Sequence, residues 1–297
     1  MGIRVLKGGM MTTVQDLGRT GYQSQGFSVS GVMDVRSFKI ANLLLDNPEN
    51  EAVLEFTLIG PTLEFTSETI ISITGGDFRP QINGKPAKMY TAIYMHRGDI
   101  LTFGGARTGT RGYLDVPVVM GSRSTNIKCQ IGGYKGRKLE DEDYIAFRAK
   151  RRYLPYYLSR SLDLDEFDQE KITLRVVMGP QEKMFTKEGR ETFLNSEYTV
   201  TSEFDRMGCR LEGPFIAYKT TSDIISDGIA FGSVQVPSHG KPIILLADRQ
   251  TTGGYAKIAT VVSVDIPKLV QRKTEQKVRF QAVSVEEAQK LLADEMK

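Results

Sequence analysis

The sequence predicts a mainly β protein that contains two β-barrel lobes and a few short helices. Three observations support this prediction: short apolar runs alternate with turn-forming residues, helical periodicity is confined to two segments, and apolar residues make up 40% of the 297 residues. An apolar fraction of this size is typical of a soluble globular protein with a packed core. Because the chain is about twice the usual length of a single domain, one large domain or two medium ones are expected.

The predicted strands of the first half lie close together and are separated by residues that favour turns. They cover residues 53–58, 62–65, 70–74, 89–95 and 100–103. Asn83-Gly84 separates two short extended segments, and this pair favours a tight hairpin because both central residues of the turn need positive φ. An antiparallel meander that closes into a barrel is therefore expected.

Two helices are predicted, one in each half of the chain. The first begins near Val35, where Asp34 can accept hydrogen bonds from free N–H groups, and ends before Asn47-Pro48. The second follows Ser284 and Glu287, which have the spacing of a capping box. This second helix is predicted to cover one end of a barrel with four apolar residues: Ala288, Leu291, Leu292 and Met296.

The strand pattern is interrupted between residues 149 and 170, where a basic cluster, Pro155, three tyrosines and an acidic run follow one another. The predicted organisation is an N-terminal lobe of residues 1–148, a connector of residues 149–170 and a C-terminal lobe of residues 171–297, which includes the terminal helix. Residues 97–103 and 274–280 end their lobes on a similar pattern. This weak internal echo indicates two related lobes without proving a duplication.

Composition and charge exclude several classes of protein. The chain has 39 basic and 36 acidic residues, and a net charge of +3 is too small to indicate a nucleic-acid partner. The apolar runs are much shorter than the roughly 20 residues that span a bilayer, so no membrane span is predicted. Cys129 and Cys209 cannot form a disulfide framework, and the N-terminus has no apolar signal core. A cytoplasmic protein is therefore expected.

The sequence lacks the motifs of several common enzyme classes. His96 and His239 are the only histidines, and neither has a second ligand at metal spacing, so no metal site is predicted. No Gly-x-Ser-x-Gly elbow, P-loop or dinucleotide fingerprint occurs. Acid–base chemistry would therefore fall to Asp, Lys or Tyr, and any nucleotide would bind in another way, with help from a partner.

Polar clusters in the first half predict part of a binding site for a small molecule. Gln15, Asp16 and Arg19 form one cluster, and Asp34 stands at a helix N-terminus, where free N–H groups favour a carboxylate or carbonyl oxygen. The alternative for these residues is structural, with Asp34 as an N-cap only and Asp16 paired with Arg19.

Glycines surround Arg107 and Arg111, and this combination suits an anionic ligand because guanidinium groups and exposed N–H groups converge on oxygen atoms. A plain hairpin loop is the alternative. Further candidates for binding substrate or phosphate follow along the chain: Tyr113, Ser122, Arg123 and Ser124.

The densest polar segments lie in the second half. Asp248 and Arg249 follow the apolar run 243–246, where polar groups are costly unless they pair with each other or with a ligand. Asp248 is expected to orient Arg249 or to act as a base, and Lys257 to neutralise a phosphate or carboxylate. The other candidates for binding here are Arg206, Gln235, Gln250, Thr251, Thr252 and Tyr255. The catalytic candidates of the whole chain are Asp16, Asp34, Asp227, Asp248 and Lys257.

Six segments together carry a resemblance to a known family: residues 9–19, 30–34, 41–44, 121–125, 226–229 and 247–255. In this order, and over nearly the whole chain, they closely resemble the family of the 5-oxoprolinase C component. The same family is known as the KipA or allophanate hydrolase subunit 2 family and as a carboxyltransferase-like domain. The motifs are short, but their collinear order is highly specific. The resemblance implies two cyclophilin-like β-barrel lobes.

The resemblance also implies partners and a reaction. In this family the chain pairs with a B component, which is a KipI-like protein, and with an A component, which is a LamB/YcsF-type protein. The assembly couples ATP hydrolysis to the opening of 5-oxo-L-proline to L-glutamate, so ATP with Mg²⁺ is expected in the complex and little activity in this chain alone. Phosphorylation of the lactam oxygen makes the carbonyl a better electrophile, and arginines with backbone donors would stabilise the developing charge.

Two other functions stay open. A carboxyltransferase lobe of the urea carboxylase type would receive a carboxyl group from biotin in a cleft between two partner lobes. A KipA-like regulatory protein would only bind a KipI-like inhibitor of a histidine kinase. One departure from the family lies beside Arg111 and Tyr113: Leu114 runs directly into Asp115, where the family has a small Ala/Gly-rich loop.

Overall fold

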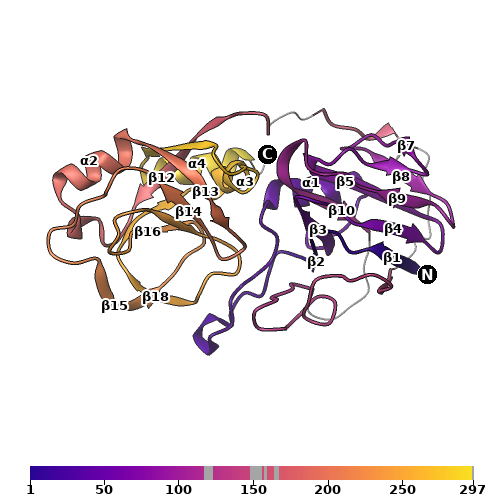
Figure 1. Ribbon diagram of the computed structural model, residues 1–297, viewed down its shortest axis with the longest axis horizontal. Helices are drawn as coiled ribbons and strands as arrows, with labels where there is room; N and C mark the ends of the chain where they lie inside the picture. Colours follow the sequence, from indigo (N-terminus) through magenta and orange to yellow (C-terminus); the bar gives the residue numbers. More distant parts are fainter. Residues whose placement is uncertain (117–122, 148–155, 157–158, 164–166, 296–297) are drawn as a thin grey trace. The chain divides into compact units, whose positions relative to one another are not determined.

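The computed structural model describes residues 1–116, 123–147, 156, 159–163 and 167–295, and Figure 1 shows its strands and helices. Backbone contacts divide the chain into two compact units: residues 1–19 with 30–168, and residues 20–29 with 169–297. Most of the predicted connector, residues 149–170, lies outside the described residues. Residues 20–29 belong to the predicted N-terminal lobe by sequence, but they group with the second unit.

The first sheet of the first unit has six strands. Their order is β11 (Tyr144–Ala146), β1 (Gly2–Lys7), β4 (Thr62–Phe65), β9 (Ile100–Thr102), β6 (Gln81–Ile82) and β7 (Lys85–Pro86). Neighbouring strands in this sheet are antiparallel. β6 and β7 form the predicted hairpin, in which Asn83 and Gly84 have φ of +51° and +78°, as a tight turn of this kind requires.

The second sheet of the first unit has five strands and carries a helix. The strand order is β2 (Met11–Gln15), β3 (Val53–Thr57), β10 (Thr108–Asp115), β5 (Thr69–Asp77) and β8 (Ala92–Met95). Helix α1 (Val35–Leu44) packs against β5 and β10 through buried residues that include Phe38 and Ala41. Asp34 is its N-cap, as predicted.

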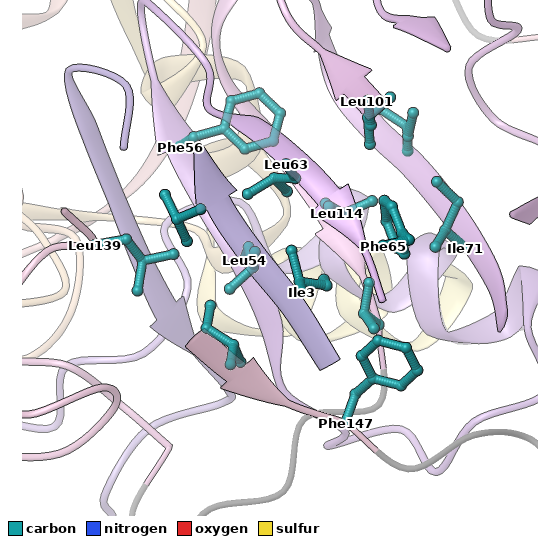
Figure 2. Packing of buried hydrophobic residues seen from close by; sticks show 14 of the residues in the cluster. Ile3, Leu54, Phe56, Leu63, Phe65, Ile71, Leu101, Leu114, Leu139 and Phe147 are labelled. Atoms are coloured by element: carbon teal, nitrogen blue, oxygen red, sulfur yellow. The ribbon is translucent and has the colours of Figure 1, made fainter. Parts of the chain in front are cut away.

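The core of the first unit is formed by apolar side chains from both sheets (Figure 2). Ile3, Leu63 and Leu101 come from the first sheet, and Leu54 and Leu114 from the second. The closed barrel expected for this lobe is not formed among the described residues, because β7, β11, β2 and β8 each pair with one neighbour only. Two sheets that share one core bury their apolar faces without joining their edges, which explains the difference.

The second unit contains a closed barrel, which confirms that part of the predicted fold. Its strand order is β12 (Lys171–Met178), β19 (Lys257–Val261), β16 (Ser233–Gln235), β17 (Ile243–Leu245), β14 (Gly208–Glu212), β13 (Glu197–Phe204) and β20 (Lys277–Ala282). The parallel pairing of β20 with β12 closes the ring. Ile172, Leu174 and Val176 alternate with more exposed residues along β12 and point into the core, as the period of a strand requires.

Short helical elements surround the barrel. They are η1 (Gln23–Gln25), η3 (Glu182–Met184), α2 (Lys187–Asn195), η4 (Ser263–Asp265), α3 (Ile266–Val270) and α4 (Val285–Glu295). The predicted capping box of α4 is present: the Ser284 N–H donates to Glu287 Oε2 (2.8 Å), and the Glu287 N–H donates to Ser284 Oγ (3.1 Å). However, α4 fully buries none of its residues, so the expected seal of the barrel end is wrong. None of the helices described in residues 1–295 is long and apolar enough to cross a membrane.

Two strands of the second unit stand outside the barrel ladder. β15 (Asp223–Gly228) and β18 (Thr252–Tyr255) pair only with each other and lie side by side in Figure 1. They form a two-stranded sheet, here called the ribbon. Each residue of β15 is exposed or half-buried.

Candidate functional site

Asp16 lies just after β2 in a polar network of the first unit. Its carboxylate accepts a hydrogen bond from the hydroxyl of Ser124 and lies 3.5 Å from Nε of Arg123. Arg123 also forms an ion pair with Glu51, and Arg19 donates to the backbone carbonyl of Ser124. The structure therefore brings four predicted site residues together around Ser124, and Glu51 is a member that the sequence analysis missed.

Asp34 and Tyr113 are sealed in the interior of the first unit. As the N-cap of α1, Asp34 accepts from the backbone N–H of Ser37 (2.9 Å) and from its hydroxyl (2.7 Å). The Asp34 N–H donates to the Tyr113 hydroxyl (2.9 Å), and this hydroxyl donates to Oε2 of Glu55 (2.8 Å). Burial raises the pKa of Tyr113 well above its usual value, and the charges of Glu55 and Asp34 raise it further. Tyr113 is therefore neutral, and the network ties α1 to β3 and β10.

Gln15 and Arg111 are also buried in the first unit. Nε2 of Gln15 donates to the backbone carbonyl of Thr125 (3.0 Å), whereas its Oε1 has no hydrogen-bond partner among the described residues. Nη1 of Arg111 donates to the hydroxyl of Thr110 (3.2 Å). Ser122, another predicted binding residue, lies outside the described residues.

Arg107 lines a pocket of about 770 Å³ in the first unit. Its Nε lies 2.7 Å from Oδ2 of Asp77, and Arg79 contributes a second guanidinium to the pocket lining. The other walls are largely apolar and include Pro80, Pro86, Met89 and Leu162. The glycine-rich loop therefore contributes Arg107 to this pocket, while Arg111 is not among its lining residues.

Lys257 and Asp227 form an ion pair in the second unit. Nζ of Lys257 lies 2.8 Å from Oδ2 of Asp227 and donates to the backbone carbonyl of Gly228 (3.1 Å). The Lys257 side chain is 5% exposed, whereas that of Asp227 is 54% exposed. Gln181 contacts both partners, because its Oε1 accepts from the Lys257 N–H and its Nε2 donates to Asp227. The hydrogen bond from Lys257 is the main cause that lowers the pKa of Asp227, so this carboxylate is ionised at neutral pH.

Arg249 places a second cation beside the same segment. Its Nε donates to the backbone carbonyl of Ile229 (3.1 Å) and its Nη1 to that of Leu246 (3.2 Å), and its guanidinium lies over the ring of Phe231. Arg249 is only 8% exposed, and burial lowers its pKa. Among the described residues, no carboxylate forms an ion pair with it. A buried guanidinium that is neutralised only by carbonyl oxygens is a favourable place for an anionic group.

Asp248 pairs with Arg206 in a buried fork. Oδ2 of Asp248 lies 2.9 Å from Nε of Arg206, and Oδ1 lies 3.3 Å from Nη2. The two side chains are 8% and 11% exposed, and the Asp248 N–H donates to the backbone carbonyl of Arg206. The sequence analysis expected Asp248 to orient Arg249 or to act as a base, but both of its carboxylate oxygens accept from Arg206, the residue that positions it.

The remaining candidates of the second half lie on or near the ribbon. Nε2 of Gln235, a buried residue of β16, donates to the backbone carbonyl of Tyr255 (3.3 Å). Thr252 pairs with Gly228 across the ribbon. The carbonyl of Thr251 accepts from the Ile229 N–H, and Gln250 is exposed. These residues shape the backbone on which Asp227 and Lys257 meet.

The second unit therefore holds one coherent polar site, made of Asp227, Lys257, Arg249, Gln235 and Gln181. Four of these residues are predicted from the sequence, but Gln181 is not. It comes shortly after β12, 46 residues before Asp227, and no local spacing connects them. Among the described residues, no group of three or more His, Cys, Asp and Glu side chains could hold a metal ion.

Several known proteins are similar to this chain over nearly its full length. The family described as carboxyltransferase domain, subdomain A and B, matches residues 25–282. The 5-oxoprolinase C component of Escherichia coli (strain K12) is 33% identical over 308 residues, which cover 99% of this chain and 96% of that protein. The 5-oxoprolinase C component of Haemophilus influenzae is 35% identical over 285 residues, which cover 94% of this chain and 90% of that protein.

Solved structures of two longer proteins contain the same fold. The crystal structure of the Kluyveromyces lactis urea amidolyase has a TM-score of 0.90 and 29% identity, and the match covers 99% of this chain and 19% of that chain. The Kluyveromyces lactis urea carboxylase has a TM-score of 0.88 over 99% of this chain and 28% of that chain. The resemblance drawn from the collinear motifs is confirmed: this chain belongs to the carboxyltransferase-domain family and, within it, is a homologue of the 5-oxoprolinase C component.

Proposed function

We propose that this chain is the C component of an ATP-dependent 5-oxoprolinase, a hydrolase that converts 5-oxo-L-proline, ATP and water to L-glutamate, ADP and phosphate. The observation that carries the proposal is end-to-end similarity: the match covers 96% of the Escherichia coli C component but only 17% of the Saccharomyces cerevisiae urea amidolyase. The proposed partners are a KipI-like B component and a LamB/YcsF-like A component. Because the reaction consumes ATP, we place the complex in the cytoplasm.

The polar site of the second unit supplies the chemistry that the proposal needs. Opening an activated lactam creates negative charge on its oxygen, and fixed cations stabilise such charge best where water is excluded. Lys257 and Arg249 are both buried, and they hold the carbonyls of adjacent residues, Gly228 and Ile229. We assign Lys257 and Arg249 to contacts with anionic oxygens of the substrate or of phosphate.

Asp227 is proposed to orient Lys257. Its carboxylate is ionised and accepts from Nζ of Lys257, so it fixes the direction of the ammonium group. A carboxylate with a lowered pKa is a weak base, which favours the orienting role over proton abstraction. Gln181 holds both members of the pair and completes the support.

ATP with Mg²⁺ is proposed to bind in the assembled complex. The described part of this chain offers two buried cations for phosphate oxygens, Lys257 and Arg249, and no cluster of acidic side chains for the ion itself. We therefore assign Mg²⁺ to ATP and to groups of the partner proteins. ATP supplies the phosphoryl group that activates the lactam.

The experiment is reconstitution of the purified chain with its KipI-like and LamB/YcsF-like partners, followed by measurement of 5-oxoproline-dependent ADP and glutamate formation. Lys257→Met is expected to lower turnover at least about 100-fold, because one positioned charge at a developing oxyanion contributes about that much. Lys187→Met is the matched control, since that lysine is 77% exposed and lies on α2. Wild-type complex that never forms glutamate would refute the proposed function.

A second candidate function is a biotin-dependent carboxyltransferase lobe. It is favoured by the family description and by the TM-score of 0.90 to the urea amidolyase structure. This function requires a biotinylated carrier and bicarbonate, with a urea-type acceptor. Turnover that avidin abolishes would support it, whereas glutamate formation in the presence of avidin would exclude it.

A further inference from the structure

The ribbon exposes a large apolar side chain. Ile225, in the middle of β15, is 96% exposed. The ribbon register shifts around it: Asp223 pairs with Tyr255 and Asp227 with Gly253, so β15 spends four residues where β18 spends two. Such a bulge re-aims side chains, and bulges are common beside functional sites. Here it presents Ile225 to solvent two residues before Asp227, a member of the polar site.

Two glycines of the ribbon are not required by the chain itself. A Cβ added to Gly228 would meet no atom within 4 Å, and one added to Gly254 would meet only ordinary contacts at 3.5 and 3.9 Å. Neither residue has positive φ. Gly253 differs, since an added Cβ would lie 2.7 Å from Ile229 and 2.8 Å from Gln235. The free space above Gly228 and Gly254 is therefore available to a backbone from outside the chain.

Acidic groups stand on either side of Ile225. Asp227 is ionised and half exposed, and Asp223 forms no ion pair with any described residue. A complementary surface would combine an apolar pocket with basic groups at its border. A small ligand at the Asp227–Lys257 pair would leave Ile225 uncovered, whereas a protein surface would cover both, because the two features are continuous along β15.

We propose that the ribbon is the docking surface for another protein of the same enzyme complex, which receives Ile225 in an apolar pocket bordered by basic side chains. The backbone of that partner approaches the ribbon at Gly228 and Gly254. The inference rests on the proposed function, in which this chain works only within a complex. Docking at Ile225 brings groups of the partner to the neighbouring Asp227–Lys257 pair and completes a site that is open on that side.

The experiment measures the affinity of the full chain for the KipI-like and LamB/YcsF-like partners, singly and together, by biolayer interferometry. Ile225→Asp is expected to weaken binding at least about tenfold, as loss of a central apolar anchor does. Gly254→Val is expected to have the same effect, because Val fits the ribbon but fills the space above it. Leu292→Asp is the control, since Leu292 on α4 is also exposed (42%) but lies outside the ribbon.

The outcomes separate the docking surface from the function on which it rests. Both ribbon variants should keep the wild-type thermal unfolding midpoint, which shows that lost binding is not lost folding. Wild-type affinity in Ile225→Asp and Gly254→Val would overturn the docking surface while leaving the proposed function intact. Self-association that Ile225→Asp abolishes without changing the affinity for either partner would overturn it as well. A wild-type chain that binds neither partner would refute the complex and, with it, the docking surface.

Discussion

Asp248 illustrates how a residue that reads as catalytic in the sequence acquires another role in the structure. It follows an apolar run and precedes Arg249, so the sequence favours a direct interaction between these neighbours. In the structure its two oxygens accept from Arg206 instead, at 2.9 and 3.3 Å. A buried bidentate pair of this kind is sensitive to the loss of one partner, because the other charge is then left without compensation.

We expect Asp248→Ala to lower the free energy of unfolding by about 3 kcal/mol, since it leaves the Arg206 guanidinium buried without its carboxylate. Urea denaturation of the purified chain measures this loss. Glu203→Ala is the control: its side chain is 71% exposed and pairs with Arg210, so a change below about 0.5 kcal/mol is expected. A stable Asp248→Ala chain whose complex loses turnover would instead place Asp248 in the chemistry.

At the scale of elements, one buried carboxylate connects β12 with the helical turn that follows β19. Asp265 precedes α3, and its side chain is fully buried. It accepts from the Arg175 N–H and Nε, each at 2.8 Å, and from Nζ of Lys268 at 2.9 Å. Burial alone raises the pKa of Asp265, but the hydrogen bonds from Arg175 and Lys268 together outweigh burial and lower it.

This ion pair predicts a dependence of stability on pH. Because the pKa of Asp265 is lower in the folded than in the unfolded chain, the pair stabilises the fold above the unfolded value of about 4. The contribution is lost as the pH falls through the folded pKa. We expect the urea midpoint of the wild type to fall below about pH 4, and that of Asp265→Asn to be lower at pH 7 and to change less with acid. Parallel acid curves for the two proteins would contradict this prediction.

At the scale of the whole molecule, the barrel of the second unit closes through a parallel pair that only the tertiary structure creates. β20 lies beside β12 from Lys171 opposite Lys277 to Val176 opposite Ala282. One more hydrogen bond, from the Val283 N–H to the Val176 carbonyl, follows the ladder. α4 comes after this closure and contacts η4 without fully burying any residue.

Removal of α4 is therefore expected to leave the barrel folded. A chain that ends at Val283 should unfold within about 4 °C of the full chain, because a change of roughly 1 kcal/mol shifts the midpoint of a unit of this size by that much. Differential scanning calorimetry measures the shift. A chain that ends at Lys273 lacks β20 and should lose the transition of the second unit. A large loss after removal of α4 alone would show that the helix holds the barrel closed.

Local features of the sequence predicted local structure well. The Asn83-Gly84 hairpin, the Asp34 cap and the Ser284–Glu287 capping box depend on hydrogen bonds and φ angles within a few residues, and all three are present. Helix α2 was missed because its nine residues are mostly polar and only Gly189 and Phe193 are buried, so its apolar periodicity is weak. The grouping of candidate residues depended on contacts that local spacing does not contain.

The sequence by itself determined the mainly β character, the two-part organisation of the polar clusters and the family, because strand alternation, turn residues and collinear motifs are written along the chain. Only the tertiary structure decided which polar residues meet. It buried Asp34 and Tyr113 beside Glu55, paired Asp248 with Arg206, and brought Lys257 to Asp227 across 30 residues of sequence. The physical reason is that strand register and barrel closure set these distances, and both result from the packing of apolar faces far apart in the chain.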